Sequence, residues 1–409
     1  MIKYTPPSAS KLIEVKLPSD CLEIGMNVTH LDRPWTEVPV LLQGLTIETP
    51  DDVLMLKKHC DYVFIEIEKK FWLDVKKGSM EQKSDIHYPG FRECEDIHQA
   101  LPKAKISFER AKKQINEVLE CISNGELFDM DASRLAIKSC VSSILTNANA
   151  LLWLTQIKKQ DQYTAEHSLR VGILSIAFGR FVGLKDRELE TVGLCGMLHD
   201  VGKMKIPNKV LNKPSSLTDQ EFDVMKLHPV YGNEILNELK NVDKIIKDTA
   251  HYHHERMDGK GYPQSLSAGY LHKYIRMVSI VDVYDAITSA RSYKDSSPAF
   301  DALKILFSER GKHFDSELVE AFIRMVGIYP PGTLVEMTNG EVGIVVSAND
   351  DSRLRPKVEL VMTSNKKFRQ SLIINLMDSE NDSSGAVYNI KRGLSNGTYG
   401  VDVQNYLTK

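Results

Sequence analysis

The sequence predicts an α+β protein in which a mostly helical domain lies between a small β-rich N-terminal domain and a small C-terminal β appendage. Apolar residues recur at helical spacing across the middle of the chain, whereas they alternate with polar residues near both ends. The length of 409 residues corresponds to two or three domains of about 150 residues each.

Residues 1–70 contain short alternating runs, which predict the small β-rich domain. We expect one helix to interrupt it, because Pro50 suits a first helical position and acids follow at Asp51 and Asp52. A regulatory role for this domain is inferred only from its place before the helical one. Residues 71–105 are polar and irregular, so we expect a linker or a mobile loop. The alternating runs are residues 13–17, 38–47 and 62–68.

Residues 106–327 form the predicted helical domain. Thr218 and Glu221 have the spacing of a capping box, and Pro229 suits the first turn of a further helix. The periodic segments lie near 107–124, 133–158, 164–182 and 186–203.

Residues 328–409 return to the two-residue period of strands. Apolar runs flank Asn339-Gly340, which predicts a hairpin with a type I′ turn. A further strand is expected at 358–362, and the whole segment is interpreted as a cap on the helical domain.

Composition excludes several classes of protein. Hydrophobic residues make up 42% and charged residues 26%, which are ordinary globular values. The net charge of −3 predicts no binding to duplex nucleic acid or to an anionic membrane. We find no apolar stretch of about 18 residues and no signal-peptide core, so we expect a cytoplasmic protein without a membrane span. The six cysteines form no Cys-x-x-Cys pair, which argues against a zinc ribbon or a disulfide framework.

Histidine is concentrated in the helical segment, where seven of the 12 histidines lie between His167 and His272. Asp282 interrupts the apolar run MVSIVDVYDA, and a buried carboxylate requires a cation or a proton. A metal ion supplies that cation. The candidate ligands are His167, His199, Asp200, His228, His253, His254 and Asp282.

This mixed nitrogen and oxygen set is too large for one tetrahedral zinc ion but suits two ions that share a carboxylate. His199 and Asp200 are adjacent and point about 100° apart on a helix, so we expect Asp200 to bridge the ions. Such a pair holds a hydroxide between the ions for attack on phosphorus. The set therefore predicts phosphoester hydrolysis without a covalent protein intermediate.

Three basic residues are candidates for contact with the substrate. Lys203 follows Asp200 by about one helical turn, where its ammonium group can meet a phosphate oxygen. Arg291 and Lys294 are spaced to bind a second phosphate or the rest of a nucleotide.

The segments HD-x-x-K, H-P-x-x-G, HHERMDGKGYP and VDVYDAITSARSYK resemble, in this order, the HD-GYP phosphodiesterases of the HD superfamily. The resemblance covers about residues 150–325, and IGMNVTHLDRPWTEVPVLLQG is similar to a domain of unknown function that often accompanies them. It implies hydrolysis of a 3′,5′-cyclic dinucleotide, either cyclic di-GMP or 3′,3′-cyclic GMP-AMP, to the linear dinucleotide.

The resemblance also implies roles for individual residues. Asp200 would be shared by the two ions, and Lys203, Arg291 and Lys294 would contact phosphates. Asp285 would support the substrate or a nearby water, and Tyr262 would lie at the substrate site. The Gly261-Tyr262-Pro263 loop would contact diguanylate cyclase domains. One ion would be held by His167, His199, Asp200 and Asp282, and the other by Asp200, His228, His253 and His254.

One departure from the family decides the expected number of ions. Members with a third metal carry a glutamate four residues before the first histidine, where this chain has Tyr163. We therefore expect two divalent ions per chain. Iron or manganese suits a histidine-rich site with a bridging carboxylate, and nickel, copper or zinc would compete in vitro.

Two alternatives stay open at this point. A non-catalytic receptor or a cyclase-binding adaptor would bind a cyclic dinucleotide without turnover, but Lys203 and the intact ligand set argue against it. A related HD hydrolase would act on another nucleotide, which the GYP run disfavours.

Overall fold

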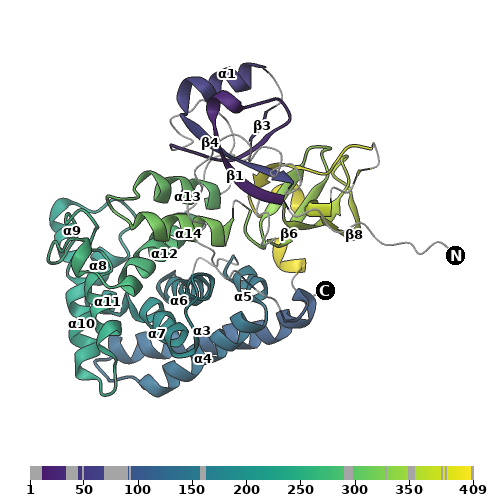
Figure 1. Cartoon of the computed structure of the whole chain (residues 1–409). Coiled ribbons are helices and arrows are strands. Elements are labelled where there is room, and N and C mark those ends of the chain that lie inside the picture. Colours follow the sequence, from purple (N-terminus) through teal and green to yellow (C-terminus); the bar gives the residue numbers. More distant parts are fainter. Residues whose placement is uncertain are drawn as a thin grey trace. The chain divides into compact units, whose positions relative to one another are not determined.

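The chain folds into two compact units, Met1–His87 with Asn349–Leu354 and Tyr88–Ala348 with Arg355–Lys409 (Figure 1). None of the helices in the described part combines the length and apolarity that a membrane crossing requires. The computed structural model describes residues 12–33, 45–47, 50–68, 91, 94–156, 163–289, 298–327, 329–348, 355–378, 381–382 and 385–406.

Within the described residues, the first unit is a small sheet with one helix. Its antiparallel strands have the order β1-β4-β2-β3, and helix α1 (Pro50–His59) begins at the proline as predicted. Val28 and Val63 are fully buried in its core. Most of the predicted strand at 38–47 lies outside the described residues, which retain only its end. The strands are β1 (Leu12–Pro18), β2 (Asn27–Leu31), β3 (Leu45–Thr46) and β4 (Tyr62–Glu68).

The second unit is built around the helix α6 (Tyr163–Phe181), which α3, α4, α5, α7, α12 and α14 contact (Figure 1). Every residue of α6 from Ala165 to Gly179 is buried, including the charged residues Glu166 and Arg170, so the helix is enclosed on all sides. Its neighbours are α3 (Ile97–Ser123), α4 (Met130–Thr146), α5 (Ala148–Thr155), α7 (Asp186–Leu198), α12 (Lys273–Ser289) and α14 (Ser316–Val326). The remaining helices in the described part of the chain are α8 (Asn208–Leu211), α9 (Asp219–Met225), α10 (His228–Glu238), α11 (Lys244–Tyr252) and α13 (Pro298–Ser308).

Three helix boundaries differ from the expected ones. The helix expected at 186–203 ends at Leu198, so His199 and Asp200 follow it and do not lie within a helix. Helix α3 begins at Ile97 and so includes residues 97–105, which were expected to belong to the linker. That expectation was wrong because Pro102, near the start of the helix, obscured the periodicity. The segment expected as one helix at 133–158 divides at Asn147, whose side chain accepts from the N–H of Ala150 and starts α5. The capping box at Thr218 and the proline in the first turn of α10 are confirmed.

The C-terminal sheet has the strand order β8-β7-β6-β5-β9, and it shares a hydrophobic core with the helices. The hairpin around Asn339-Gly340 is confirmed, but its turn is not type I′, because only Gly340 has a positive φ, of 84°. The N–H of Gly340 donates to the carbonyl of Met337, which makes a three-residue loop ending in a glycine bulge. The strands are β5 (Leu334–Met337), β6 (Val342–Ser347), β7 (Lys357–Met362), β8 (Phe368–Asn375) and β9 (Ile390–Leu394).

Candidate metal centre

Five helices bring the predicted ligands together from positions far apart in the sequence. His167 lies in the first half of α6, His199 and Asp200 follow α7, and Asp282 lies in the middle of α12. The other ligands come from the start of α10 and the end of α11: His228, His253 and His254. All seven fall into two groups whose candidate ligand atoms lie within 4.8 Å of one another.

Asp200 lies between the two groups and turns one oxygen toward each. Its Oδ2 is 3.2 Å from Nε2 of His199 and 3.6 Å from Nε2 of His167. Its Oδ1 is 3.3 Å from Nε2 of His228 and 3.6 Å from Nε2 of His253. A carboxylate placed in this way has the geometry of a bridge between two ions.

Backbone carbonyls fix the tautomer of three of the histidines. Nδ1 of His199 lies 2.7 Å from the carbonyl oxygen of Gly196, and Nδ1 of His228 lies 2.7 Å from that of Met225. Nδ1 of His253 is 3.1 Å from the carbonyl oxygen of Ala250. Because a carbonyl can only accept, each Nδ1 must donate, so Nε2 is the nitrogen that faces the centre and is available to an ion there.

Close backbone packing brings Asp200 against His228. An added Cβ on Gly202 would lie 2.9 Å from Cα of Gly232, and still closer to the carbonyl oxygen of His228 and the nitrogen of Gly232. Only glycine allows the turn after α7 to approach the start of α10 so closely. The glycine in HDVGK therefore has a structural reason, which the ligand pattern alone did not reveal, whereas a Cβ on Gly232 in HPVYG would make only ordinary contacts, from 3.5 Å.

The carboxylates and imidazoles perturb one another strongly. Burial opposes ionisation of Asp200, yet Lys203 and His199 hold the pKa of its carboxyl well below the usual value. Burial likewise disfavours protonation of His199, but the adjacent Asp200 and Asp282 raise its pKa to about 10. Burial lowers the pKa of His228 to about 3. The first group thus holds protons that a metal ion would replace, whereas His228 is already neutral.

The unsatisfied atoms of the centre fit a metal ion. Nε2 of His199 and Oδ1 of Asp200 are buried, and neither makes a hydrogen bond within the described residues. Buried polar atoms normally have hydrogen-bond partners. Imidazole nitrogens and carboxylate oxygens are also ligand atoms that bind divalent cations. The donor set is therefore suited to such an ion.

Of the residues expected to contact substrate, Lys203 lies at the centre. Its ammonium group donates to Oδ2 of Asp200, and its side chain keeps 22% of its surface exposed. Arg291 and Lys294 lie outside the residues that the structure describes, so their expected contact with phosphate stays a prediction.

Asp285 was expected to support the substrate or a nearby water, and the structure places it behind His167. It is 2% exposed, and its Oδ2 accepts from Nδ1 of His167 at 2.8 Å. Arg170 donates to both of its oxygens, from Nε at 2.8 Å and from Nη2 at 3.1 Å. Nε2 of His167, on the other side of the ring, faces Asp282 at 3.0 Å. This burial behind His167 argues against contact with substrate, and Asp285 instead orients a candidate ligand.

The GYP loop packs against the second group of ligands. The ring of Tyr262 stacks on His254 with centroids 4.7 Å apart, so it covers a candidate ligand and is only partly exposed to a partner. Gly261 approaches the preceding turn so closely that an added Cβ would lie 2.6 Å from the nitrogen of Arg256. The buried carboxylate of Glu255 anchors the loop, because it accepts from the N–H groups of Gln264 and Leu266 at 2.6 and 2.9 Å.

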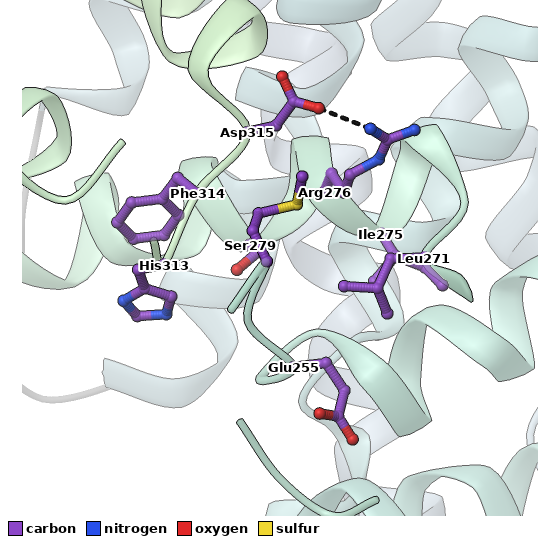
Figure 2. A pocket seen from close by; sticks show the side chains of 9 residues that line it. Glu255, Leu271, Ile275, Arg276, Ser279, His313, Phe314 and Asp315 are labelled. Carbon is purple, nitrogen blue, oxygen red and sulfur yellow. Dashed lines mark hydrogen bonds and ion pairs between the residues drawn. The ribbon is translucent and has the colours of Figure 1, made fainter. Parts of the chain in front are cut away.

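A small pocket lies on another side of Glu255 and contains the ion pair between Arg276 and Asp315, whose atoms are 2.6 Å apart (Figure 2). None of the seven candidate ligands lines this pocket. We therefore do not assign the substrate to it.

Arg170 and Glu255 are the supporting residues that the sequence reasoning missed. Both are charged and nearly fully buried, at 3% and 2% exposure. Each is within four residues of a candidate histidine, in HSLRV and in HHE, which was the available signal.

Comparison with known proteins gives three family matches along the chain. The HD domain matches residues 152–318, a domain of unknown function (DUF3391) matches residues 14–133, and a KOW domain associated with HD domain matches residues 334–382.

Individual relatives extend these matches. The chain is 31% identical over 364 residues to cyclic di-GMP phosphodiesterase PA4108 of Pseudomonas aeruginosa, and the alignment covers 86% of each protein. It is 31% identical over 234 residues to 3′3′-cGAMP-specific phosphodiesterase 2 of Vibrio cholerae, covering 54% of this chain and 45% of that protein. Among solved structures, Bd1817, an HDG"Y"P protein from Bdellovibrio bacteriovorus, aligns with a TM-score of 0.47 and 19% identity, covering 76% of this chain and 98% of that one.

Proposed function

Because the chain belongs to the HD-GYP family of phosphodiesterases, we propose that it hydrolyses a 3′,5′-cyclic dinucleotide at a centre of two metal ions. Metal-dependent hydrolysis of a cyclic dinucleotide is the activity that the family and the donor set support. The proposal of two ions rests on one observation: the two oxygens of the Asp200 carboxylate face different groups of histidines.

In this proposal each ion has three ligands of its own and shares Asp200. The first ion would be held by His167, His199 and Asp282, and the second by His228, His253 and His254. When bound, such a pair supplies a water acidic enough to attack phosphorus at neutral pH and neutralises charge on the phosphoryl oxygens.

The chain's own residues would orient the substrate. The Lys203 ammonium group is held beside Asp200 and is partly exposed, so it can meet a non-bridging phosphate oxygen. His254 is the partly exposed member of the second group. The substrate phosphate would thus approach between Lys203 and His254, and Arg291 and Lys294 would bind the remaining phosphate.

The native ions are proposed to be iron or manganese, since imidazoles with a bridging carboxylate suit both. Nickel, copper or zinc would bind during purification because affinity alone does not select among these ions. Cyclic di-GMP is the first substrate to test, because a relative matched along most of the chain is named for it. 3′,3′-Cyclic GMP-AMP is the competing substrate, named in a relative that matches about half of the chain.

The test is turnover by protein reconstituted without oxygen with iron or manganese, with both dinucleotides offered and the products separated by chromatography. His199→Ala serves as the blank, and His272→Ala serves as the matched control because His272 is exposed and outside both groups. We expect metal-dependent linear product from the wild type and from His272→Ala only. Tight binding without product, at two ions per chain, would contradict the proposal and favour a receptor.

A further inference from the structure

A chain of charged side chains runs from the surface of α3 to a candidate ligand. Nζ of Lys112 donates to Oε1 of Glu166 at 2.7 Å, and Oε2 of Glu166 lies 3.5 Å from Nη1 of Arg170. Arg170 in turn donates to Asp285, which accepts from Nδ1 of His167 at 2.8 Å. The chain thus joins three helices, α3, α6 and α12.

Most of this chain is buried. Glu166 is 5% exposed, Arg170 is 3% exposed and Asp285 is 2% exposed, whereas the Lys112 side chain keeps 21% of its surface exposed. Removing charged groups from water is unfavourable, and close pairing offsets that desolvation only when the geometry is good. Apolar side chains of similar volume would be buried at a lower cost in free energy. The buried charges therefore point to a role in orienting neighbouring side chains.

The Arg170 fork fixes the plane of the Asp285 carboxylate. Two parallel contacts, of 2.8 and 3.1 Å, hold both oxygens in the guanidinium plane. Since Oδ2 also accepts from Nδ1 of His167, the plane of the carboxylate sets the rotation of the imidazole ring. That rotation directs Nε2 of His167 toward Asp282 and Asp200, at 3.0 and 3.6 Å.

We propose that Lys112, Glu166 and Arg170 are positioning residues that hold His167, through Asp285, in its ligand orientation. This inference rests on the proposed metal centre. Lys112 lies outside the residues matched by the HD domain and inside those matched by the domain of unknown function, 14–133. The segment that precedes the HD domain therefore contributes to the geometry of the first ion's site.

The test is a stepwise titration of the whole metal-free 409-residue chain with Mn²⁺, monitored by calorimetry, together with kcat and KM for the dinucleotide. The variants are Arg170→Lys, which keeps the charge but loses the fork, and Lys112→Met. Lys112→Arg is the conservative rescue. Lys113→Met is the matched control, because Lys113 lies on the same helix with an 81% exposed side chain paired to Glu117.

We expect Arg170→Lys to weaken one of two binding steps by about 10- to 100-fold, the usual cost of losing a partner behind a ligand. Lys112→Met should weaken the same step by a smaller factor, Lys112→Arg should restore it, and Lys113→Met should match the wild type. The second step should stay unchanged, because His228, His253 and His254 have no contact with this chain of charges among the described interactions.

Thermal unfolding of the metal-free variants separates positioning from general destabilisation. Equal weakening of both steps, or Arg170→Lys and Lys112→Met binding as the wild type does, would overturn the inference. A wild-type chain that binds no metal would overturn the proposed function itself. Two normal binding steps in every variant would overturn only the positioning role, so the two failures can be told apart.

Discussion

Gly202→Ala tests how the centre is assembled, because it changes no candidate ligand. The added methyl group would meet the carbonyl oxygen of His228 and the nitrogen and Cα of Gly232, which are all backbone atoms. A flexible side chain could move aside, but two packed segments of backbone must separate instead. The separation would draw Asp200 away from His228, whose Nε2 lies 3.3 Å from Oδ1.

The displacement can be bounded from the structure. The added Cβ would lie 2.9 Å from Cα of Gly232, whereas ordinary contact begins at 3.4 Å, so the segments must separate by at least about 0.5 Å. The closer contacts with His228 and Gly232 require more. Overpacking of this kind costs about 1–3 kcal/mol of stability, and a misplacement of about 1 Å lowers turnover by about 100-fold.

The assay compares Gly202→Ala with Gly269→Ala, since a Cβ at Gly269 would meet nothing within 4 Å. We expect Gly202→Ala to lower kcat by about 100-fold and to weaken binding of the second ion, while it remains folded at the assay temperature. Gly269→Ala should match the wild type. Equal turnover and equal metal content in the two variants would refute the argument that close packing of these segments builds the centre.

Three further predictions concern the centre and its loop. Asp200→Asn should abolish turnover and remove at least one ion per chain, measured by metal analysis; normal turnover with two ions would contradict the bridging role. Metal binding near neutral pH should release protons, measured by calorimetry in buffers of different ionisation enthalpy, because His199, with a pKa raised to about 10, is protonated in the metal-free chain. Affinity should therefore rise with pH, and pH-independent binding would contradict this. Glu255→Gln should destabilise the chain by about 1.5–3 kcal/mol, since it loses charge-assisted bonds to two backbone N–H groups. Thermal unfolding would measure this loss, with Glu234→Gln as the control because the Glu234 side chain is 54% exposed.

The sequence predicted the order of the three parts and the residues of the candidate centre. It could do so because imidazoles and carboxylates within apolar helices are costly unless something binds them, and this cost is visible in the local sequence. The structure brings all seven residues together, while their role as ligands stays a prediction.

Features that depend on distant contacts could not be predicted in the same way. The resemblance implied that Asp285 supports the substrate or a nearby water, and its contact with Arg170 could not be foreseen because Arg170 lies on another helix, 115 residues earlier. Lys112 reaches Glu166 from a helix whose start was obscured by Pro102. The type I′ turn was inferred from Asn339-Gly340, which also suits the three-residue loop that forms.

The exposed fractions of the ligands limit how a substrate can approach. His199 is fully buried and His167 is 2% exposed, so the first group is closed on the side of α6 and α7. Lys203, beside Oδ2 of Asp200, and His254, in the group around Oδ1, both remain partly exposed. Because these two residues lie on opposite sides of the shared carboxylate, an entering phosphodiester would meet both proposed ions at once. That access suits displacement at phosphorus, in which the attacking and leaving oxygens both require stabilisation.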